Sequence, residues 1–495
     1  MAAKHWGGLG LKRGSLAALF VVVLAAVAGG AAAAQFEGFG VETGTIALAG
    51  VAALAGLALV ATGPIACLLA IVLLAASGFQ PVIVNAGNAD ITITDFFYAG
   101  LVFWWLRAMV VRIQTRPLER PRTVAFGQTA AVAFLLFAGL TLFQVAASEP
   151  ASFGESATSW LRLAQSATLA WLAASVLETP RQIRLVLAAV VAGAVIAVIA
   201  SLAVGGASVD ERARGTLGPN ILGLMCGFGM VIAALANVPG RIELRAGAIA
   251  VCLVGLLLSQ SVAAFVAVGF ALALGAALYA APSDSPRTSA AQRTSRIMLA
   301  VILAGLVVFG TIQQLRPEVT PGGEGFQAGS GTHRAILATA GLEIFERNPI
   351  VGVGWRGSND PNVIGSREIA AEVRRRFPQA RGVFFPDVNP TSVHNLYVQL
   401  LADLGLVGFS LFLGLAAVIG YRSVELLRRL GRGHDLWRPA FAMSLCLVLL
   451  LIWHNDNPLY GGQTETVIPV ILIGALAAVA RMTLPQPGRR GEGAA

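Results

Sequence analysis

The sequence predicts an all-α membrane protein that crosses the bilayer about 14 times. Three observations predict this fold class. The chain has 495 residues, of which 56% are hydrophobic and only 12% are charged, about half the charged fraction of a typical soluble protein. Apolar runs long enough to cross a bilayer recur along most of its length. Short loops rich in arginine separate many of these runs, as expected between the spans of a multi-pass protein.

The expected spans can be placed in chain order. The first, residues 15–34, follows Lys4, Lys12 and Arg13, and we interpret it as an uncleaved helix because no convincing signal-peptide cleavage site fits. The fourth begins near Asp95, a carboxylate that either favours a helix start or lines a functional cavity. The other spans are expected near residues 45–61, 64–79, 123–146, 159–177, 185–204, 220–236, 246–258, 262–281, 297–313, 396–421, 439–453 and 466–480.

Four segments are expected: transmembrane helices in 1–315, a large loop in 316–392, further transmembrane helices in 393–484, and a disordered tail in 485–495. The large loop carries nine arginines and eight acidic residues and is too long for a simple connector. The apolar pattern predicts two short helices in it, from about Thr332 to Phe345 and from Ser366 to Phe377. The second ends with Arg374, Arg375 and Arg376, either as a solvated face near headgroups or as a contact for an anionic lipid or glycan.

Arginine placement predicts the orientation. With the amino terminus in the cytoplasm, about 23 basic residues fall on the cytoplasmic side, and the short outer loops hold about two, Arg212 and Arg214. The net charge of +9 is therefore distributed over loops and does not form a groove-sized patch for nucleic acid. This orientation puts the large loop outside, together with Arg334 and His394. Both chain ends and the tail are expected in the cytoplasm.

Three helices are expected to begin on the outer side, each near a basic or imidazole group. Thr332 can cap the helix of Arg334, and Thr391 and Ser392 can cap the helix that His394 begins. The third helix begins at Pro219-Asn220, just after Arg214. Helix amino termini offer free N–H groups and partial positive charge, which suit an anionic ligand. Neither paired acids nor CxxC cysteines predict a metal site, so we expect no metal and no cofactor.

Two sequence blocks carry a resemblance. The block VHNLYVQLLADLGLVGF contains His394-Asn395, nine residues, and then Gly405-x-x-Gly408; the block GTHRAILATAGLEIFERNPIVGVG contains Arg334. In this order they resemble the O-antigen ligase family, bacterial membrane enzymes that transfer lipid-linked glycans. The run ARGTLGPN is similar to a further motif of that family and contains Arg214. One departure is Val262, where relatives often have an arginine.

The resemblance implies a GT-C-like enzyme of the inner membrane, metal-independent and inverting, with its active site facing the periplasm. The donor would be a glycan on undecaprenyl diphosphate, and the acceptor lipid A–core or another glycan. His394 would be the catalytic base, since a neutral imidazole can accept the acceptor's proton. Arg334 and Arg214 would bind the diphosphate, since guanidinium groups bind phosphate in a bidentate manner. Asn395, Arg212, Asn220 and Tyr397 are further candidates to line the substrate site.

Two alternatives stay open. An O-antigen or exopolysaccharide polymerase of the same superfamily needs the same diphosphate pocket and base, and differs in its acceptor. A transporter of a small anion would need broken helices with paired polar groups near the middle of the bilayer. No charge pair lies in the middle of an expected span, and this disfavours transport.

Overall fold

The computed structural model describes residues 60–80, 82–86, 89–115, 137–145, 150–205, 216–279, 330–378, 393–455, 457 and 463–483. The predicted spans at 15–34 and 297–313, the larger part of those at 45–61 and 123–146, and the tail at 485–495 lie outside these residues. Arg212 and Arg214 also lie outside them.

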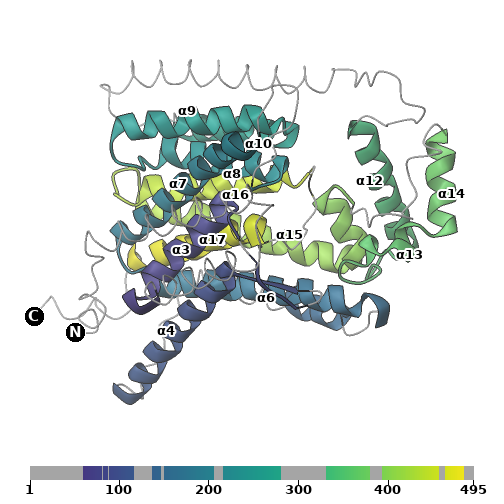
Figure 1. The fold of residues 1–495 in the computed structure, drawn as a ribbon, viewed down its shortest axis with the longest axis horizontal. Helices are drawn as coiled ribbons and strands as arrows, with labels where there is room; N and C mark the ends of the chain where they lie inside the picture. The colour runs from purple at the N-terminus through teal and green to yellow at the C-terminus, as the bar shows by residue number, and fades with distance from the viewer. Residues whose placement is uncertain are drawn as a thin grey trace, which may run out of the picture.

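Apolar helices form a bundle over most of the described chain (Figure 1). Its helices are α3 (Pro64–Ser77), α4 (Ile93–Thr115), α6 (Pro150–Val176), α7 (Pro180–Gly205), α8 (Pro219–Leu235), α9 (Ile242–Ser259), α10 (Val262–Tyr279), α15 (Leu396–Leu430), α16 (Trp437–Trp453) and α17 (Gln463–Thr483). Within the described residues, α4, α7, α9, α15 and α17 are long and apolar enough to cross a membrane by length and composition. Four shorter apolar helices are α3, α8, α10 and α16. The predicted multi-pass helical architecture is therefore confirmed, and the number of spans stays a prediction.

Between α3 and α4 the chain forms a short antiparallel hairpin. Its strands are β1 (Val82–Ala86) and β2 (Ala89–Thr92). Both segments are rich in valine, isoleucine or threonine, whose branched side chains favour extended backbone. Apart from this hairpin, the regular elements that the structure describes are helical, as the composition predicts.

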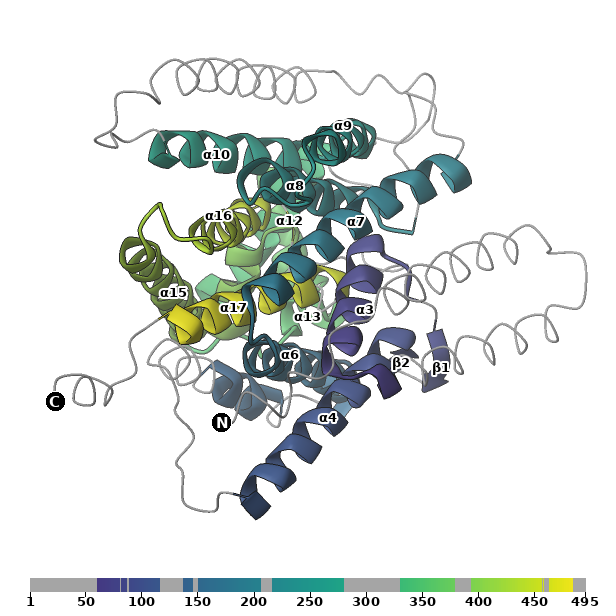
Figure 2. The ribbon, with the colours of Figure 1, turned by 90° about the vertical axis from the view of Figure 1, so that its left-hand side faces the viewer.

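The bundle is organised around α8, which contacts α7, α9, α10 and α16. In both views α9 and α10 lie along one side of the bundle and α4 lies on the opposite side (Figure 1, Figure 2). Glycine allows close crossings: a Cβ at Gly474 of α17 would overlap the carbonyl oxygen of Ala170 in α6. Small residues at such contacts let helix backbones approach where lipid removes the hydrophobic driving force.

A smaller group of helices lies at one end of the bundle (Figure 1). It contains α12 (Ser330–Arg347), the 3₁₀ turn η3 (Gly357–Asn359), α13 (Pro361–Ile364) and α14 (Arg367–Arg376). These helices have their own apolar core, made of Ile336, Leu337, Ala340, Ile344, Ile364, Ile369, Val373, Val393 and Ala402. We call residues 330–378 and 393–404 the end subdomain. The two predicted loop helices are confirmed as α12 and α14.

Candidate functional site

Helix α15 is broken near its start. Gly405 has φ 62° and ψ −165°, which divides the helix into residues 396–404 and 406–430. Almost only glycine adopts this backbone conformation. A break of this kind removes helical hydrogen-bond partners from carbonyl groups before it and from N–H groups after it. These groups need other partners if they are buried.

The loop that follows α12 supplies those partners. Four backbone hydrogen bonds run from N–H to carbonyl oxygen: Val353 to Ala402 (3.0 Å), Gly354 to Asp403 (2.9 Å), Leu406 to Pro349 (2.8 Å) and Val407 to Ile350 (3.2 Å). We call residues 349–354 and 402–407 the splice. The loop therefore completes the hydrogen bonding of the broken helix on both sides of the break.

Glycine is required on both partners of the splice because the two backbones touch. Gly352 has φ 70°, and a Cβ there would overlap the carbonyl group of Asp403. A Cβ at Gly405 would likewise overlap the carbonyl group of Ile350. The Asn-Pro…Gly-Val-Gly run and the His-Asn…Gly-x-x-Gly run, about 50 residues apart in sequence, thus form one structural unit.

A buried carboxylate lies at the splice. Asp403 is 1% exposed, and its Oδ1 accepts a hydrogen bond from the N–H of Ser358 at 2.8 Å. Its Oδ2 is buried without a hydrogen-bond partner in the described structure, as are Oγ of Ser358 and Oδ1 of Asn359. The sequence prediction missed this residue. The available signal was a carboxylate two positions before a glycine inside an apolar helix.

The start of α15 is fixed by Asn395. Its Oδ1 accepts hydrogen bonds from the N–H groups of Tyr397 (2.9 Å) and Val398 (3.0 Å), so Asn395 is the helix N-cap. Its Nδ2 donates to the carbonyl of Asn455 at 2.6 Å. Capping by Thr391 or Ser392 was a wrong prediction: the helix begins at Leu396, too late for either of them to cap it. His394 is half-buried and directly precedes the cap.

The end of α16 packs against the start of α15. The carbonyl of His454 accepts from the N–H of Leu396 at 3.0 Å, and the Tyr397 hydroxyl donates to the carbonyl of Leu451 at 2.6 Å. The imidazole of His454 is buried, with Nδ1 3.1 Å from the carbonyl oxygen of Asn457. Burial lowers the pKa of His454 to about 4, because the imidazolium would lose its hydration. His454 is therefore a neutral structural residue.

The start of α8 meets the same end of α16. The indole N–H of Trp453 donates to the carbonyl of Asn220 at 3.2 Å. Thr216 lies two residues after Arg214, and its hydroxyl donates to the carbonyl of Ser77 at 2.7 Å. Two of the three predicted helix starts, those of α8 and α15, therefore converge on the end of α16. Arg212 and Arg214 precede α8 and lie outside the described residues.

The third helix start belongs to α12, which packs on the start of α15. A Cβ at Gly341 would lie 2.7 Å from Val398 and 3.0 Å from Val393. Arg334 lies seven residues before Gly341, hence on the same helix face and about 10 Å along the axis. The helix begins at Ser330, so Thr332 lies inside it, and its predicted role as the cap is wrong. Arg334 is half-buried.

Residues 247–413 match the family model described as O-Antigen ligase. The match runs from the first turns of α9 through α12 and α14 to beyond the break in α15, so it includes Arg334, the splice and His394. The matched segment, 167 of the 495 residues, is similar to the O-antigen ligase family. No curated protein matches the chain.

Together with the apolar helices, this similarity indicates a multi-pass membrane protein. The similarity also points to glycan transfer of the O-antigen ligase or polymerase type. The matched segment covers the end subdomain and its junction with α15, which is where Arg334, His394, Asn395 and Tyr397 lie, whereas Arg212, Arg214 and Asn220 precede it.

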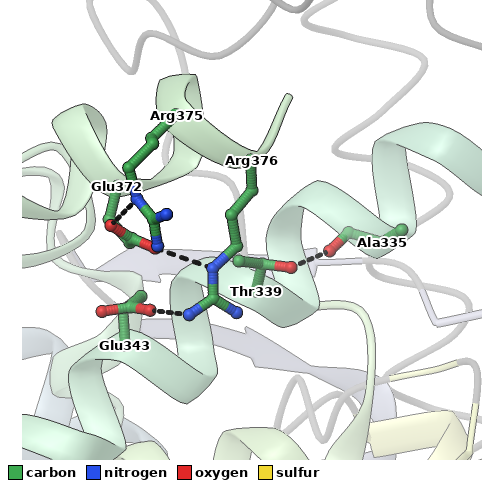
Figure 3. Close-up of polar contacts among 6 residues, drawn as sticks. All are labelled: Ala335, Thr339, Glu343, Glu372, Arg375 and Arg376. Carbon is green, nitrogen blue, oxygen red and sulfur yellow. Dashed lines mark hydrogen bonds and ion pairs between the residues drawn. The ribbon is translucent and has the colours of Figure 1, made fainter. Parts of the chain in front are cut away.

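Two arginines of the basic run of α14 are bound within the protein (Figure 3). Nε of Arg375 and Nε of Arg376 pair with the carboxylate of Glu372 at 2.8 and 2.7 Å, and Nη2 of Arg376 pairs with Glu343 of α12 at 2.7 Å. Hydrogen bonds from these two guanidinium groups lower the pKa of Glu372 to about 2. Arg376 therefore links α14 to α12, and contact of the run with an anionic lipid or glycan stays a prediction.

The structure also places Asp95. Its Oδ1 accepts from Nη1 of Arg162 (2.6 Å) and Nε2 of Gln165 (2.7 Å), and its Oδ2 accepts from the N–H of Thr92 (2.8 Å). The carboxylate lies in the first turn of α4 and ties α4 to Arg162 in α6. Arg162 and Gln165 also line a small cavity between α3, α4, α6 and α17. The helix-start role of Asp95 is supported by its hydrogen bond from Thr92, and a functional role of the cavity stays a prediction.

Proposed function

We propose that this chain transfers a glycan from a polyprenyl diphosphate carrier to an acceptor hydroxyl at the periplasmic face of the bacterial inner membrane. The observation that supports this most is the splice. It holds the helix of Arg334 and the segment of His394 in one unit, inside the part of the chain that matches the ligase family. The likeness to the family name favours ligation of a finished glycan onto lipid A–core over chain polymerisation.

The leaving group determines which residues are needed. When the glycosidic carbon leaves its carrier, negative charge develops on the diphosphate oxygens. Arg334 and Arg214 supply permanently charged, bidentate donors for that charge, assisted by the amino termini of α8 and α12. We assign this charge stabilisation to arginine, because the guanidinium group is permanently charged, and propose a metal-independent reaction.

His394 completes the reaction. The acceptor hydroxyl attacks the anomeric carbon, a new C–O bond forms, and the bond to the diphosphate oxygen breaks. The hydroxyl proton passes to the neutral imidazole of His394, and the polyprenyl diphosphate leaves as an anion. A single displacement of this kind inverts the anomeric configuration. Asn395 sets the position of His394 through its bonds to both α15 and the end of α16.

The remaining candidates are assigned by their position. Asn220 lies at the start of α8 and Tyr397 in the first turn of α15, and both contact the end of α16. Their hydrogen bonds to backbone carbonyl groups favour a role in shaping the site over a role in chemistry. Arg212 is proposed as a further contact for the donor near Arg214.

The test uses purified full-length protein in lipid nanodiscs, with a polyprenyl diphosphate-linked glycan and lipid A–core as acceptor. His394→Ala should reduce turnover by about a hundred- to ten-thousand-fold while donor affinity persists. Arg334→Ala should weaken donor binding as well, by about 1.5–3 kcal/mol, and Arg334→Lys should restore only part. Activity should survive EDTA.

The matched controls are residues of the same type away from the site. His434 precedes α16 at its other end and accepts a hydrogen bond from the N–H of Leu436. Arg347 closes α12 and pairs with Glu368. Normal turnover of His394→Ala, at the level of His434→Ala, would remove the histidine from the chemistry. A ladder of products with lipid-linked repeats, and no transfer to lipid A–core, would identify the polymerase alternative.

A further inference from the structure

An apolar surface patch surrounds the splice. Its four side chains are among the exposed large hydrophobics of the protein: Ile350 (66% exposed), Val351 (54%), Leu406 (51%) and Val407 (42%). They are neighbours because the N–H of Val407 donates to the carbonyl of Ile350 across the splice. We call these four residues the splice patch. Two of them belong to a segment that the sequence places in a hydrophilic loop.

The splice patch continues the exposed apolar face of α15. Beyond the break, Leu413, Tyr421 and Val424 are exposed on this helix, which is a candidate membrane span. Residues 406–430 number 25, which extend about 37 Å at 1.5 Å per residue, against a hydrocarbon thickness of about 30 Å. Exposed apolar side chains on such a helix face acyl chains.

The charges of α15 set its depth in the bilayer. Arg422, Arg428 and Arg429 lie toward its end, and both Arg422 and Arg429 pair with Glu425. A span needs about 20 apolar residues, and counting 20 residues back reaches Gly408 from Arg428 and Ala402 from Arg422. When these arginines lie at one headgroup layer, Leu406 and Val407 therefore lie at or just inside the opposite edge of the hydrocarbon. Ile350, bonded to Val407, must lie at that same depth.

The loop also meets the condition that hydrocarbon imposes on backbone. Lipid offers no hydrogen bonds, so irregular backbone can enter it only when its polar groups are satisfied by the protein. The carbonyls of Pro349 and Ile350 accept from Leu406 and Val407. The carbonyl of Val351 accepts from Nε2 of Gln144 at 2.5 Å.

We propose that the splice patch is embedded among lipid acyl chains at the edge of the bilayer and anchors the end subdomain to the membrane surface. The partner is the bilayer itself. Residues 349–351 then form a membrane-inserted loop within a segment that otherwise lies in water. If the proposed function holds, this anchor keeps Arg334 and His394 near the headgroup level, where the diphosphate of a lipid-linked donor lies.

The test measures the depth of a fluorophore. Full-length Ile350→Cys and, separately, Val351→Cys are labelled with an NBD maleimide in vesicles of phosphatidylethanolamine and phosphatidylglycerol. Leu413→Cys marks the lipid face of α15, and Ala371→Cys marks an exposed position on α14. The unsubstituted chain, whose four cysteines are buried, is the labelling blank. Labels are quenched either by nitroxide-bearing lipid or by aqueous iodide.

Labels at 350 and 351 should be quenched by nitroxide lipid and protected from iodide, as at 413, and the label at 371 should show the reverse. If labels at 350 and 351 respond to iodide as the label at 371 does, the patch faces water and the proposal fails. A patch that is instead covered by another protein would be shielded from both quenchers, which also refutes it. None of these outcomes depends on catalytic turnover, so failure of the proposed function would be seen separately.

Discussion

Replacing Gly405 by alanine tests the splice most directly. Gly405 combines φ 62° with ψ −165°, a conformation that costs a non-glycine residue about 1–3 kcal/mol. A Cβ there would also overlap the carbonyl of Ile350, so relaxation must move the loop away. Two of the four splice hydrogen bonds flank this point, each contributing about 0.5–1.5 kcal/mol. The expected destabilisation of the end subdomain is about 2–6 kcal/mol.

The chain supplies matched controls on the same helix. Gly414 and Gly420 lie in regular helix and have nothing within 4 Å of an added Cβ. Replacing a helical glycine by alanine is neutral or stabilising by up to about 1 kcal/mol. The assay is thermal unfolding of the three purified variants in nanodiscs, together with hydrogen exchange of the amides at 353, 354, 406 and 407. Gly405→Ala should unfold at lower temperature and lose amide protection at the splice, while both controls match the unsubstituted protein.

If Gly405→Ala retains both the melting temperature and the splice protection of Gly414→Ala, Gly405 does not stabilise the splice. If Gly405→Ala loses stability with protection at the splice unchanged, the loss of stability arises elsewhere, and a role of Gly405 in the splice is again refuted. Transfer activity should fall with Gly405→Ala, since the splice connects the helix of Arg334 to the segment of His394. An active enzyme with a disrupted splice would separate the fold of this junction from its function.

Other measurements test separate parts of the structure. Asn395→Ala removes an N-cap, which typically costs about 0.5–2 kcal/mol, so thermal stability should fall. The pKa of His454 in the folded protein is lowered to about 4. The stability contributed by its neutral imidazole is therefore complete above about pH 6.5 and is lost as the pH falls toward 4. His454→Gln should flatten that part of the curve of unfolding free energy against pH. The pKa of Glu372 is lowered to about 2. The stability contributed by its charged carboxylate is therefore present above about pH 4.3 and is lost as the pH falls toward 2. Glu372→Gln should abolish this loss of stability at low pH. Cysteine placed at Gly323 should react with a membrane-impermeant reagent in spheroplasts, and cysteine at Ser289 should not; the reverse would overturn the predicted orientation.

Local patterns allowed much of the fold to be predicted. Apolar runs with basic ends indicated helices close to those observed for α3, α8, α10 and α16. In the loop, the stripe of Ile369 and Val373 identified α14, because an amphipathic helix buries residues spaced three and four apart. Such signals depend only on residues within one helix, so a single sequence contains them.

Contacts between distant segments could not be predicted in the same way. The ion pair between Asp95 and Arg162 joins α4 to α6. Nothing in the sequence near Asp95 or Arg162 indicates that the two residues form an ion pair. The hairpin between α3 and α4 depends on pairing between two strands of four and five residues, too short to show a clear strand pattern in the sequence. The cap of α15 was placed too early because Thr391 and Ser392 are good capping residues, whereas Asn395 makes the observed hydrogen bonds.

The splice gives the glycines of the two sequence blocks a physical reason. Gly405 lets the helix open, and Gly352 lets the loop reach the carbonyl groups that the opening exposes. Neither glycine contacts the groups that are proposed to act on the substrates. Gly405 nevertheless determines the position of His394, because the break at Gly405 ends the short helix that His394 precedes. The loop that supplies the missing hydrogen bonds directly follows α12. Within α12, two turns separate Arg334 from Gly341, which packs on Val393 and Val398. The spacing between histidine and glycine therefore has to be constant for the base and the arginine to keep their relative position. A one-residue insertion between His394 and Gly405 should rotate the histidine by about 100° around the helix axis and abolish transfer, even where the bundle folds normally.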